Sequence, residues 1–129
     1  MTKDSCKPHG ELSIRTIAMP ADTNHNGDIF GGWLLCQMDL AGYRVACKRS
    51  LSRVTTVAID GLSFQHPVAV GDAVCCYCDI TKIGRTSIQI HIESWALSLQ
   101  HGDKKHKVTE GIFTYVAIDD NGKPHPVDS

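Results

Sequence analysis

The chain lacks a marked excess of either charge and has no long apolar run. Thirteen lysines and arginines stand against 14 aspartates and glutamates, so the formal net charge is −1. Such a balance provides no basic surface for nucleic acid. No segment approaches the roughly 18 apolar residues of a membrane span, and the polar start lacks the apolar core of a signal peptide. The composition therefore predicts a cytoplasmic protein that binds neither nucleic acid nor membrane.

The chain also lacks the paired spacings that are typical of cysteine zinc sites, although it has six cysteines. Without a secretory signal, reduced thiols are expected. Cys75, Cys76 and Cys78 lie in an apolar, strand-like run, with Cys76 and Cys78 on one face and Cys75 on the other. Cys36 and Cys47 fit a helix as small core residues. We therefore predict structural cysteines and no metal site.

The length of 129 residues is that of one domain. Residues 1–10 are polar and are expected to be frayed or disordered. Residues 11–119 should form the single domain, and residues 120–129 a short polar tail. Within the domain, residues 11–19 alternate loosely and predict a strand. Residues 21–32 contain three glycines and predict an irregular loop.

Residues 33–48 predict a helix that is apolar around nearly its whole circumference. Such a helix must be covered on every side. Four strand-like runs follow it, at 54–64, 72–83, 86–99 and 108–118. The pattern predicts an α+β fold, in which an antiparallel, curved sheet of about five strands wraps around one long central helix. A single sheet covers only one side of the helix, so we expect a second copy to cover the other.

Asp39 is the one acidic residue of the predicted helix. A buried carboxylate without partners is costly. Asp39 is therefore either a structural residue with satisfied hydrogen bonds or a general base or nucleophile in a dry cleft. The residues alone leave both roles open.

Gly31 and Gly32 open the predicted helix. The first turn of a helix has unpaired N–H groups and a partial positive charge, and glycine lets a ligand come close. Such a terminus suits a carbonyl oxygen that becomes an oxyanion, although a tight turn also explains the pair. Just upstream, Asn24 and Asp28 could shape the loop through side-chain bonds to the backbone or could orient a water molecule.

Longer motifs make the chain resemble a known family. Residues 18–39, AMPADTNHNGDIFGGWLLCQMD, resemble the signature of the YciA-type acyl-CoA thioesterases, which are bacterial hotdog-fold enzymes. Residues 64–72, FQHPVAVGD, are similar to the second landmark of that family. Residues 82–87, KIGRTS, and 113–117, FTYVA, are similar to its later strands. The resemblance extends from about residue 14 to residue 119.

The resemblance implies an acyl-CoA thioesterase whose active site lies at a dimer interface. Two subunits pair edge to edge into one continuous sheet, and dimers commonly assemble further into a trimer of dimers. By this resemblance, Asp39 provides the catalytic carboxylate and Asn24 orients the water or the thioester. Backbone N–H groups near Gly31 and Gly32 polarise the thioester carbonyl, and the two subunits share these duties.

The resemblance also implies a place for the phosphates of coenzyme A, at Gly84, Arg85 and Ser87. Judged by its position alone, Arg85 reads as a solvated turn residue. Two features depart from the wider superfamily. Phe30 stands where relatives often have histidine before the glycine pair, and the chain ends soon after its last strand, where many relatives continue.

The implied reaction is hydrolysis of acyl-CoA to a carboxylic acid and free coenzyme A. Asp39 would take a proton from water or attack the thioester directly. No metal or cofactor is expected, because coenzyme A is part of the substrate and product. A hotdog dehydratase or hydratase is the alternative enzyme, with His25 and His66 as the candidate histidines. A non-catalytic acyl-CoA-binding module is the alternative outside catalysis, and a cysteine hydrolase lacks an evident histidine partner.

Overall fold

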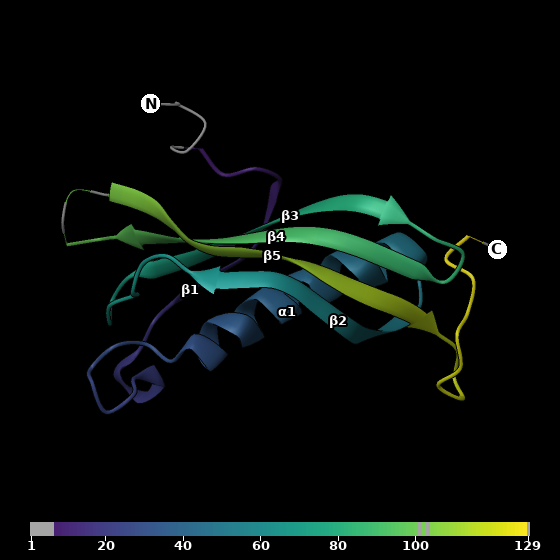
Figure 1. Cartoon of the computed structure of the whole chain (residues 1–129), viewed down its shortest axis with the longest axis horizontal. Helices are drawn as coiled ribbons and strands as arrows, with labels where there is room; N and C mark the ends of the chain where they lie inside the picture. Colours follow the sequence, from purple (N-terminus) through teal and green to yellow (C-terminus); the bar gives the residue numbers. More distant parts are fainter. Residues whose placement is uncertain (1–6, 101, 103, 129) are drawn as a thin grey trace.

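The computed structural model describes residues 7–100, 102 and 104–128 of the chain. One long helix, α1 (Gly31–Ser50), lies across one face of a five-stranded antiparallel sheet (Figure 1). The strands are β1 (Glu11–Ile17), β2 (Arg53–Phe64), β3 (Ala73–Ile83), β4 (Ser87–Ser98) and β5 (Lys104–Ile118). A short 3₁₀ turn, Pro20–Asp22, stands between β1 and α1. No helix among the described residues is long and apolar enough to cross a membrane.

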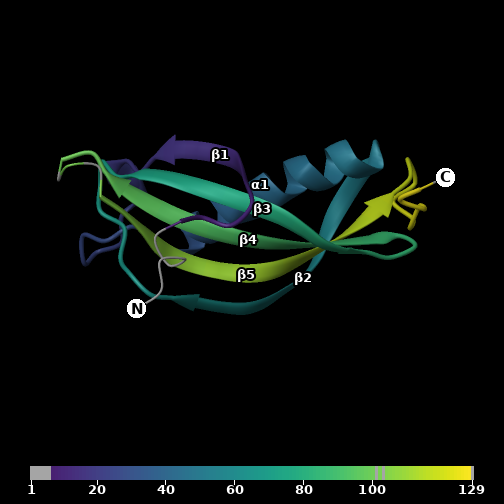
Figure 2. The same ribbon diagram turned by 90° about the horizontal axis from the view of Figure 1, so that it is seen from above.

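The strands are ordered β1-β3-β4-β5-β2 across the sheet (Figure 2). Strands β3, β4 and β5 form a meander in the centre, and β1 and β2 are the two edges. Helix α1 therefore connects one edge strand to the other in the sequence. The predicted layout, a single helix covered by a curved antiparallel sheet, is confirmed.

The core lies between α1 and the face of the sheet that the helix covers. Along β4, Ile88, Ile90 and Ile92 are fully buried against the helix, as the period of two in their sequence predicts. Met38 meets them from α1, and Phe113 from β5 belongs to the same cluster. Burying each such side chain contributes roughly 1.5–3 kcal/mol relative to exposure. This packing fixes the rotation of α1 about its axis, and hence the direction of every other side chain on it.

The side of α1 that faces away from the sheet is incompletely covered. Leu40 is 52% exposed and Tyr43 is 42% exposed. On the neighbouring edge strand, Val57 and Ile59 also expose much of their surface. The expectation that one chain leaves part of its apolar helix bare is confirmed.

Several boundaries differ from the sequence prediction. Helix α1 extends two residues further at each end than the predicted residues 33–48 and stops at Leu51, which has a left-handed backbone with φ of 56°. Strand β5 begins at Lys104, four residues before the predicted start, because its polar first residues pair with the end of β4. Polar sequence at a strand end gives little hydrophobic pattern to detect.

The cysteine predictions are confirmed on the strand and partly wrong on the helix. Cys75, Cys76 and Cys78 are buried, and only Cys76 and Cys78 belong to the core beneath the helix, as their alternation predicts. Cys47 packs against this core. Cys36, however, is exposed, because it lies on the side of α1 that the sheet does not cover.

The two ends of the described chain contact the domain. The prediction that residues 1–10 are frayed falls largely on residues 1–6, which lie outside the described part of the chain. The backbone N–H of His9 donates to Glu93 Oε1 at 3.1 Å. Near the other end, Val127 is buried and its N–H donates to the carbonyl of Arg85 at 2.9 Å.

Candidate functional site

The opening of α1 presents backbone N–H groups that no described side chain caps. Phe30 is the N-cap residue, and its side chain makes no capping hydrogen bond. Its carbonyl accepts from Trp33 and Leu34, at 3.1 and 3.3 Å. The N–H groups of Gly31 and Gly32 donate to no other described residue. A Cβ on Gly32 would meet nothing within 4 Å, so a ligand has room to approach there.

Gly31 has a second reason to be glycine. A Cβ at this position would lie 3.2 Å from Cζ of Phe64, the last residue of β2. Phe64 is itself half exposed. The opening of the helix therefore lies against an aromatic ring at the edge of the sheet, with Gly32 facing open space.

Asn24 organises the loop before the helix. Its side-chain oxygen accepts from the N–H groups of Asn26 and Asp28, at 2.9 and 3.2 Å, and its own N–H donates to the carbonyl of Asp28 at 2.7 Å. The loop-shaping role predicted for Asn24 is thus observed, and Asp28 joins it through its backbone. The side-chain NH₂ of Asn24 donates to no other described residue, so it remains available to a ligand.

Asp39 lies half-buried on α1, and one of its two carboxylate oxygens is held by hydroxyl groups. Thr56 Oγ1 donates to Asp39 Oδ1 at 2.7 Å. The hydroxyl of Tyr115 lies 3.1 Å from Oδ1 and 2.9 Å from the backbone carbonyl of Asp39. No described residue donates to Oδ2. The two hydroxyls therefore restrain the carboxylate through Oδ1 and leave Oδ2 without a partner among the described residues.

Strand pairing explains why these two hydroxyls converge. Thr56 and Tyr115 stand directly opposite each other on β2 and β5. A bulge follows Thr56 in β2, between Thr56 and Ala58. Bulges of this kind redirect side chains at functional positions. The two hydroxyls thus approach one side of α1 from adjacent strands.

Gly42 lets the ring of Tyr115 lie against the helix. A Cβ on Gly42 would lie 2.8 Å from Tyr115 Cε1 and 2.6 Å from Ile92 Cδ1, and closer still to the tyrosine hydroxyl. Gly42 follows Asp39 by three residues, so both occupy the same face of α1. Burial, with the charge of Asp39 next, raises the pKa of Tyr115 well above its ordinary range. Its hydroxyl therefore remains a neutral donor.

Gly84, Arg85 and Ser87 form the turn between β3 and β4. The N–H of Gly84 donates to the carbonyl of Ser87 at 2.8 Å, and the side chain of Arg85 is exposed. This turn lies near the C-terminal end of α1, at the opposite end of the sheet from the helix opening (Figure 1). Within one chain, the structure therefore does not bring this turn to Gly31 and Gly32.

The histidines that a dehydratase would need are not close partners of Asp39. His25 and His66 are both exposed. The ring of His66 packs against that of His106, with centroids 4.9 Å apart. Among the described residues, the partners of the Asp39 carboxylate are the hydroxyls of Thr56 and Tyr115.

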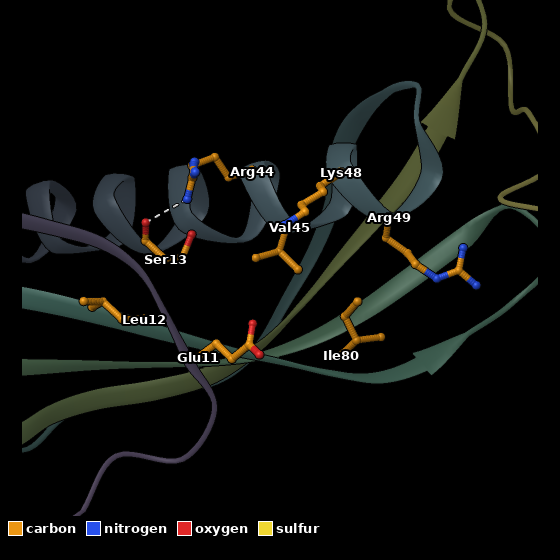
Figure 3. Close-up of a pocket in the computed structure, with 8 residues that line it drawn as sticks. All are labelled: Glu11, Leu12, Ser13, Arg44, Val45, Lys48, Arg49 and Ile80. Atoms are coloured by element: carbon orange, nitrogen blue, oxygen red, sulfur yellow. Dashed lines mark hydrogen bonds between the residues drawn. The ribbon is translucent and has the colours of Figure 1, made fainter.

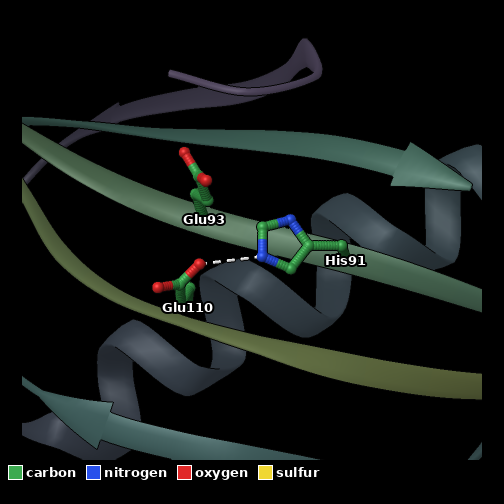
Figure 4. A group of neighbouring side chains, drawn as sticks. All are labelled: His91, Glu93 and Glu110. Atoms are coloured by element: carbon green, nitrogen blue, oxygen red, sulfur yellow. Dashed lines mark hydrogen bonds and ion pairs between the residues drawn. The ribbon is translucent and has the colours of Figure 1, made fainter. Parts of the chain in front are cut away.

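A second polar cluster lies on the face of the sheet that points away from α1. His91, Glu93 and Glu110 place one potential metal-ligand atom each within 4.8 Å of one another (Figure 4). Protein groups already bind both carboxylates. His91 and Lys107 approach Glu110 at 2.8 and 3.0 Å. Trp95 Nε1 donates to Glu93 at 2.8 Å.

A cleft of about 630 Å³ lies beside the C-terminal half of α1 (Figure 3). Its cationic residues Arg44, Lys48 and Arg49 come from the helix, and Glu11 comes from β1. Two of the cations have partners, since Arg44 donates to the carbonyl of Ser13 at 3.0 Å and Arg49 pairs with Asp128 at 2.9 Å. None of the predicted site residues lines this cleft.

Sequence reasoning proposed Asp39, Asn24 and the glycine pair as site residues, and it did not propose the residues that hold the Asp39 carboxylate. Thr56 and Tyr115 are 17 and 76 residues away from Asp39 in the sequence. The available signal was a tyrosine on the helix-facing side of the last strand. That signal becomes informative only when β5 is known to pair with β2 and when Gly42 is known to leave space on α1 for the tyrosine ring.

Comparisons with known proteins agree with this fold. A family model described as the thioesterase superfamily matches residues 26–100. The chain is 51% identical over 129 residues to the acyl-CoA thioester hydrolase YciA of Salmonella typhimurium, covering 98% of this chain and 97% of that protein. It is 50% identical to the YciA protein of Escherichia coli K12, over 91% of this chain and 90% of the relative.

Solved structures give the same result. The hexameric thioesterase from Yersinia pestis superposes with a TM-score of 0.91 at 53% identity, covering 95% of this chain and 100% of that one. A hexameric hotdog-fold thioesterase of Campylobacter jejuni superposes with a TM-score of 0.85 at 40% identity, over 91% and 90% of the two chains. The chain therefore has the hotdog fold and belongs to the thioesterase superfamily, among the YciA-type acyl-CoA thioester hydrolases.

Proposed function

We propose that the protein hydrolyses acyl-CoA to a carboxylic acid and free coenzyme A, with Asp39 as its catalytic carboxylate. The observation that carries this proposal is the carboxylate itself. Asp39 is half-buried and is held through Oδ1, and Oδ2 accepts no hydrogen bond from the described residues. Oδ2 can therefore accept a proton from water, as a general base must. The identity to the YciA acyl-CoA thioester hydrolases supports the substrate class.

The chemistry requires no metal or cofactor. Asp39 takes a proton from water, and the resulting hydroxide forms a bond to the thioester carbonyl carbon. The carbon–sulfur bond then breaks, the coenzyme A sulfur receives the proton from Asp39, and the acyl group leaves as the carboxylic acid. Direct attack by Asp39 would instead break the carbon–sulfur bond, release coenzyme A as its thiolate and form a mixed anhydride. Water then hydrolyses the anhydride, which regenerates Asp39 and supplies the proton that converts the thiolate to the thiol. Both routes need a donor for the oxyanion, and the N–H groups of Gly31 and Gly32 fit that role.

The spacing along α1 supports an active site shared by two copies. Asp39 lies eight residues after Gly31, which places the two Cα atoms about 12 Å apart along the helix. The first-turn N–H groups also point out of the helix start, away from Asp39. One thioester carbonyl therefore cannot contact both groups of the same chain. We infer that the helix opening and Asn24 of one copy face Asp39 of another.

Pairing of two copies through their β2 edges gives such an arrangement. Strand β2 is an edge of the sheet, and its Val57 and Ile59 are exposed, as are Leu40 and Tyr43 on α1. A two-fold axis there would make one ten-stranded sheet and would bring the β3–β4 turn of one copy toward the helix opening of the other. Gly84, Arg85 and Ser87 could then meet the coenzyme A phosphates, with Arg85 as the cationic group.

Further assembly of such dimers into a trimer of dimers is supported by the hexameric state of the relatives from Yersinia pestis and Campylobacter jejuni. The partners that we propose are thus acyl-CoA and further copies of the same chain. We also place the reaction in the cytoplasm.

The proposal is tested by measuring thiol release from acyl-CoA esters of several chain lengths. Asp39→Asn is expected to lose roughly 100-fold or more in kcat, the contribution expected of a general base, with the oligomer intact by size-exclusion chromatography. Asp120→Asn, which changes an exposed aspartate beyond β5, is the matched control and should behave as wild type. Near wild-type turnover by Asp39→Asn would refute the assignment.

Measurements of enoyl-CoA hydration and of coenzyme A binding, made beside the thiol-release assay, separate the alternative functions. Hydration of an enoyl-CoA without thiol release would favour the hydratase. Binding of coenzyme A by the wild type without release of thiol from any ester would favour the binding module. Asn24→Ala should also be impaired, and co-expression of Asn24→Ala with Asp39→Asn tests the shared site. Mixed dimers regain one intact site if the two residues act across subunits, and regain nothing if they act within one chain.

A further inference from the structure

We propose that Tyr115 is a positioning residue for the hydrolysis, holding Asp39 through Oδ1 so that Oδ2 is the reactive oxygen. The inference rests on the proposed function, since it assumes that Asp39 is the catalytic carboxylate. It adds that Oδ2 is the oxygen that reacts and that Tyr115 is the residue that leaves Oδ2 free to do so. Tyr115 itself touches no substrate in this scheme and acts only through Asp39.

The geometry of the hydroxyl carries the first step. Tyr115 is fully buried, and its hydroxyl lies 2.9 Å from the backbone carbonyl and 3.1 Å from Oδ1 of Asp39. One phenolic proton is thus shared between a backbone atom, which the helix fixes in space, and a side-chain atom, which could otherwise rotate. The hydroxyl ties the carboxylate to the helix backbone.

Thr56 completes the restraint. Its hydroxyl donates to the same oxygen, Oδ1, at 2.7 Å. Two donors from adjacent strands fix both the position of Oδ1 and the plane of the carboxylate. Oδ2 is then directed away from them, and no described residue donates to it. A carboxylate oxygen without a donor is the more basic and more nucleophilic of the two.

The helix is adapted to this contact. Without a side chain at Gly42, the ring of Tyr115 approaches α1 more closely than any other residue at that position would allow, since a Cβ would lie 2.8 Å from Cε1. Glycine in a helix interior is less favourable than alanine. The helix accepts this cost on the face that also carries Asp39.

The test is a double-mutant cycle in kcat and KM with Tyr115→Phe and Thr56→Val, both of which keep the shape of the side chain. Tyr115→Phe should lower kcat roughly 10-fold or more, because misplaced catalytic groups lose rate steeply, with KM within about twofold of wild type. The double variant should lose more than the product of the two single losses, because the remaining donor restrains Oδ1 in each single variant.

The matched control is Tyr77→Phe. Tyr77 also loses a hydroxyl with one hydrogen bond, from Lys105 Nζ at 3.2 Å, and it lies on β3. Tyr77→Phe should leave kcat unchanged and should combine with Thr56→Val as a simple product. Unchanged kcat in Tyr115→Phe, or a double variant no worse than the product, would overturn the inference.

Failure of the inference is distinguishable from failure of the proposed function. Loss of turnover in Asp39→Asn together with normal turnover in Tyr115→Phe leaves the hydrolase standing and removes the positioning role. Normal turnover in Asp39→Asn removes both. A thermal melt and a size-exclusion profile for each variant separate lost positioning from lost folding.

Discussion

Replacing Gly42 by alanine should destabilise the protein, although the same change stabilises most helices. Alanine in a helix interior gains about 1 kcal/mol over glycine. Here the new Cβ would lie 2.6 Å from Ile92 Cδ1 and 2.8 Å from Tyr115 Cε1. The isoleucine end can rotate, but two hydrogen bonds hold Tyr115 in place. Overpacking of a fixed core costs roughly 1–3 kcal/mol, and the upper end applies, so the net loss should be about 1–2 kcal/mol.

Urea unfolding at a fixed protein concentration measures this loss, and turnover measures its effect on the site. Gly32→Ala is the matched control for stability, because its Cβ meets nothing within 4 Å and should cost no packing energy. Because displacement of the Tyr115 ring also moves its hydroxyl, Gly42→Ala should lose activity as well as stability. If Gly42→Ala were as stable and as active as wild type, the close packing of Tyr115 against α1 would be wrong.

Two further predictions concern titrating groups. Burial raises the pKa of the Cys76 and Cys78 thiols to about 12, so iodoacetamide should modify exposed Cys36 and spare these two in the folded protein; peptide mapping that finds Cys76 alkylated before urea is added would contradict this. The hydrogen bond from Lys107, with help from His91, holds the pKa of Glu110 below its usual 4.5. Its contribution to stability is thus present above pH 4.5 and is lost as the pH falls further through the folded-state pKa. Glu110→Gln should therefore lower the free energy of unfolding near neutral pH by less than about 1 kcal/mol. It should make no difference in acid, and a gap between the two proteins that stayed constant with pH would refute the assignment.

The fold could be predicted from the sequence because its signals are local. Period-two alternation marks Ile88, Ile90 and Ile92 as one face of a strand, and they form the centre of the core. Glycine-containing turns separate the strands. The start of β5 escaped prediction because its lysine-rich opening has no apolar face, and only its pairing with the end of β4 makes it a strand.

The candidate site could be predicted only in part, and what was missed lies far from Asp39 in the sequence. Asp39 is conspicuous because it is charged within an apolar helix, and Asn24 lies in a loop rich in turn formers. Thr56 and Tyr115 are ordinary strand residues until strand pairing sets them opposite each other. The exposure of Cys36 was missed for a related reason, since the side of α1 that faces the sheet depends on all five strands.

The proposed pairing of two copies explains both the exposed apolar surface of the single chain and the separation of its helix opening from Asp39. Leu40 on α1 and Val57 on β2 are each more than half exposed, and exposed apolar surface favours association. The helix opening and Asp39 lie about 12 Å apart on one helix and cannot serve one carbonyl within one chain. Association that buries Leu40 and Val57 would also bring the helix opening of one copy to Asp39 of another. The free energy that holds the oligomer would thus also assemble the catalytic site. Dilution below the dissociation constant should abolish turnover before the individual chains unfold.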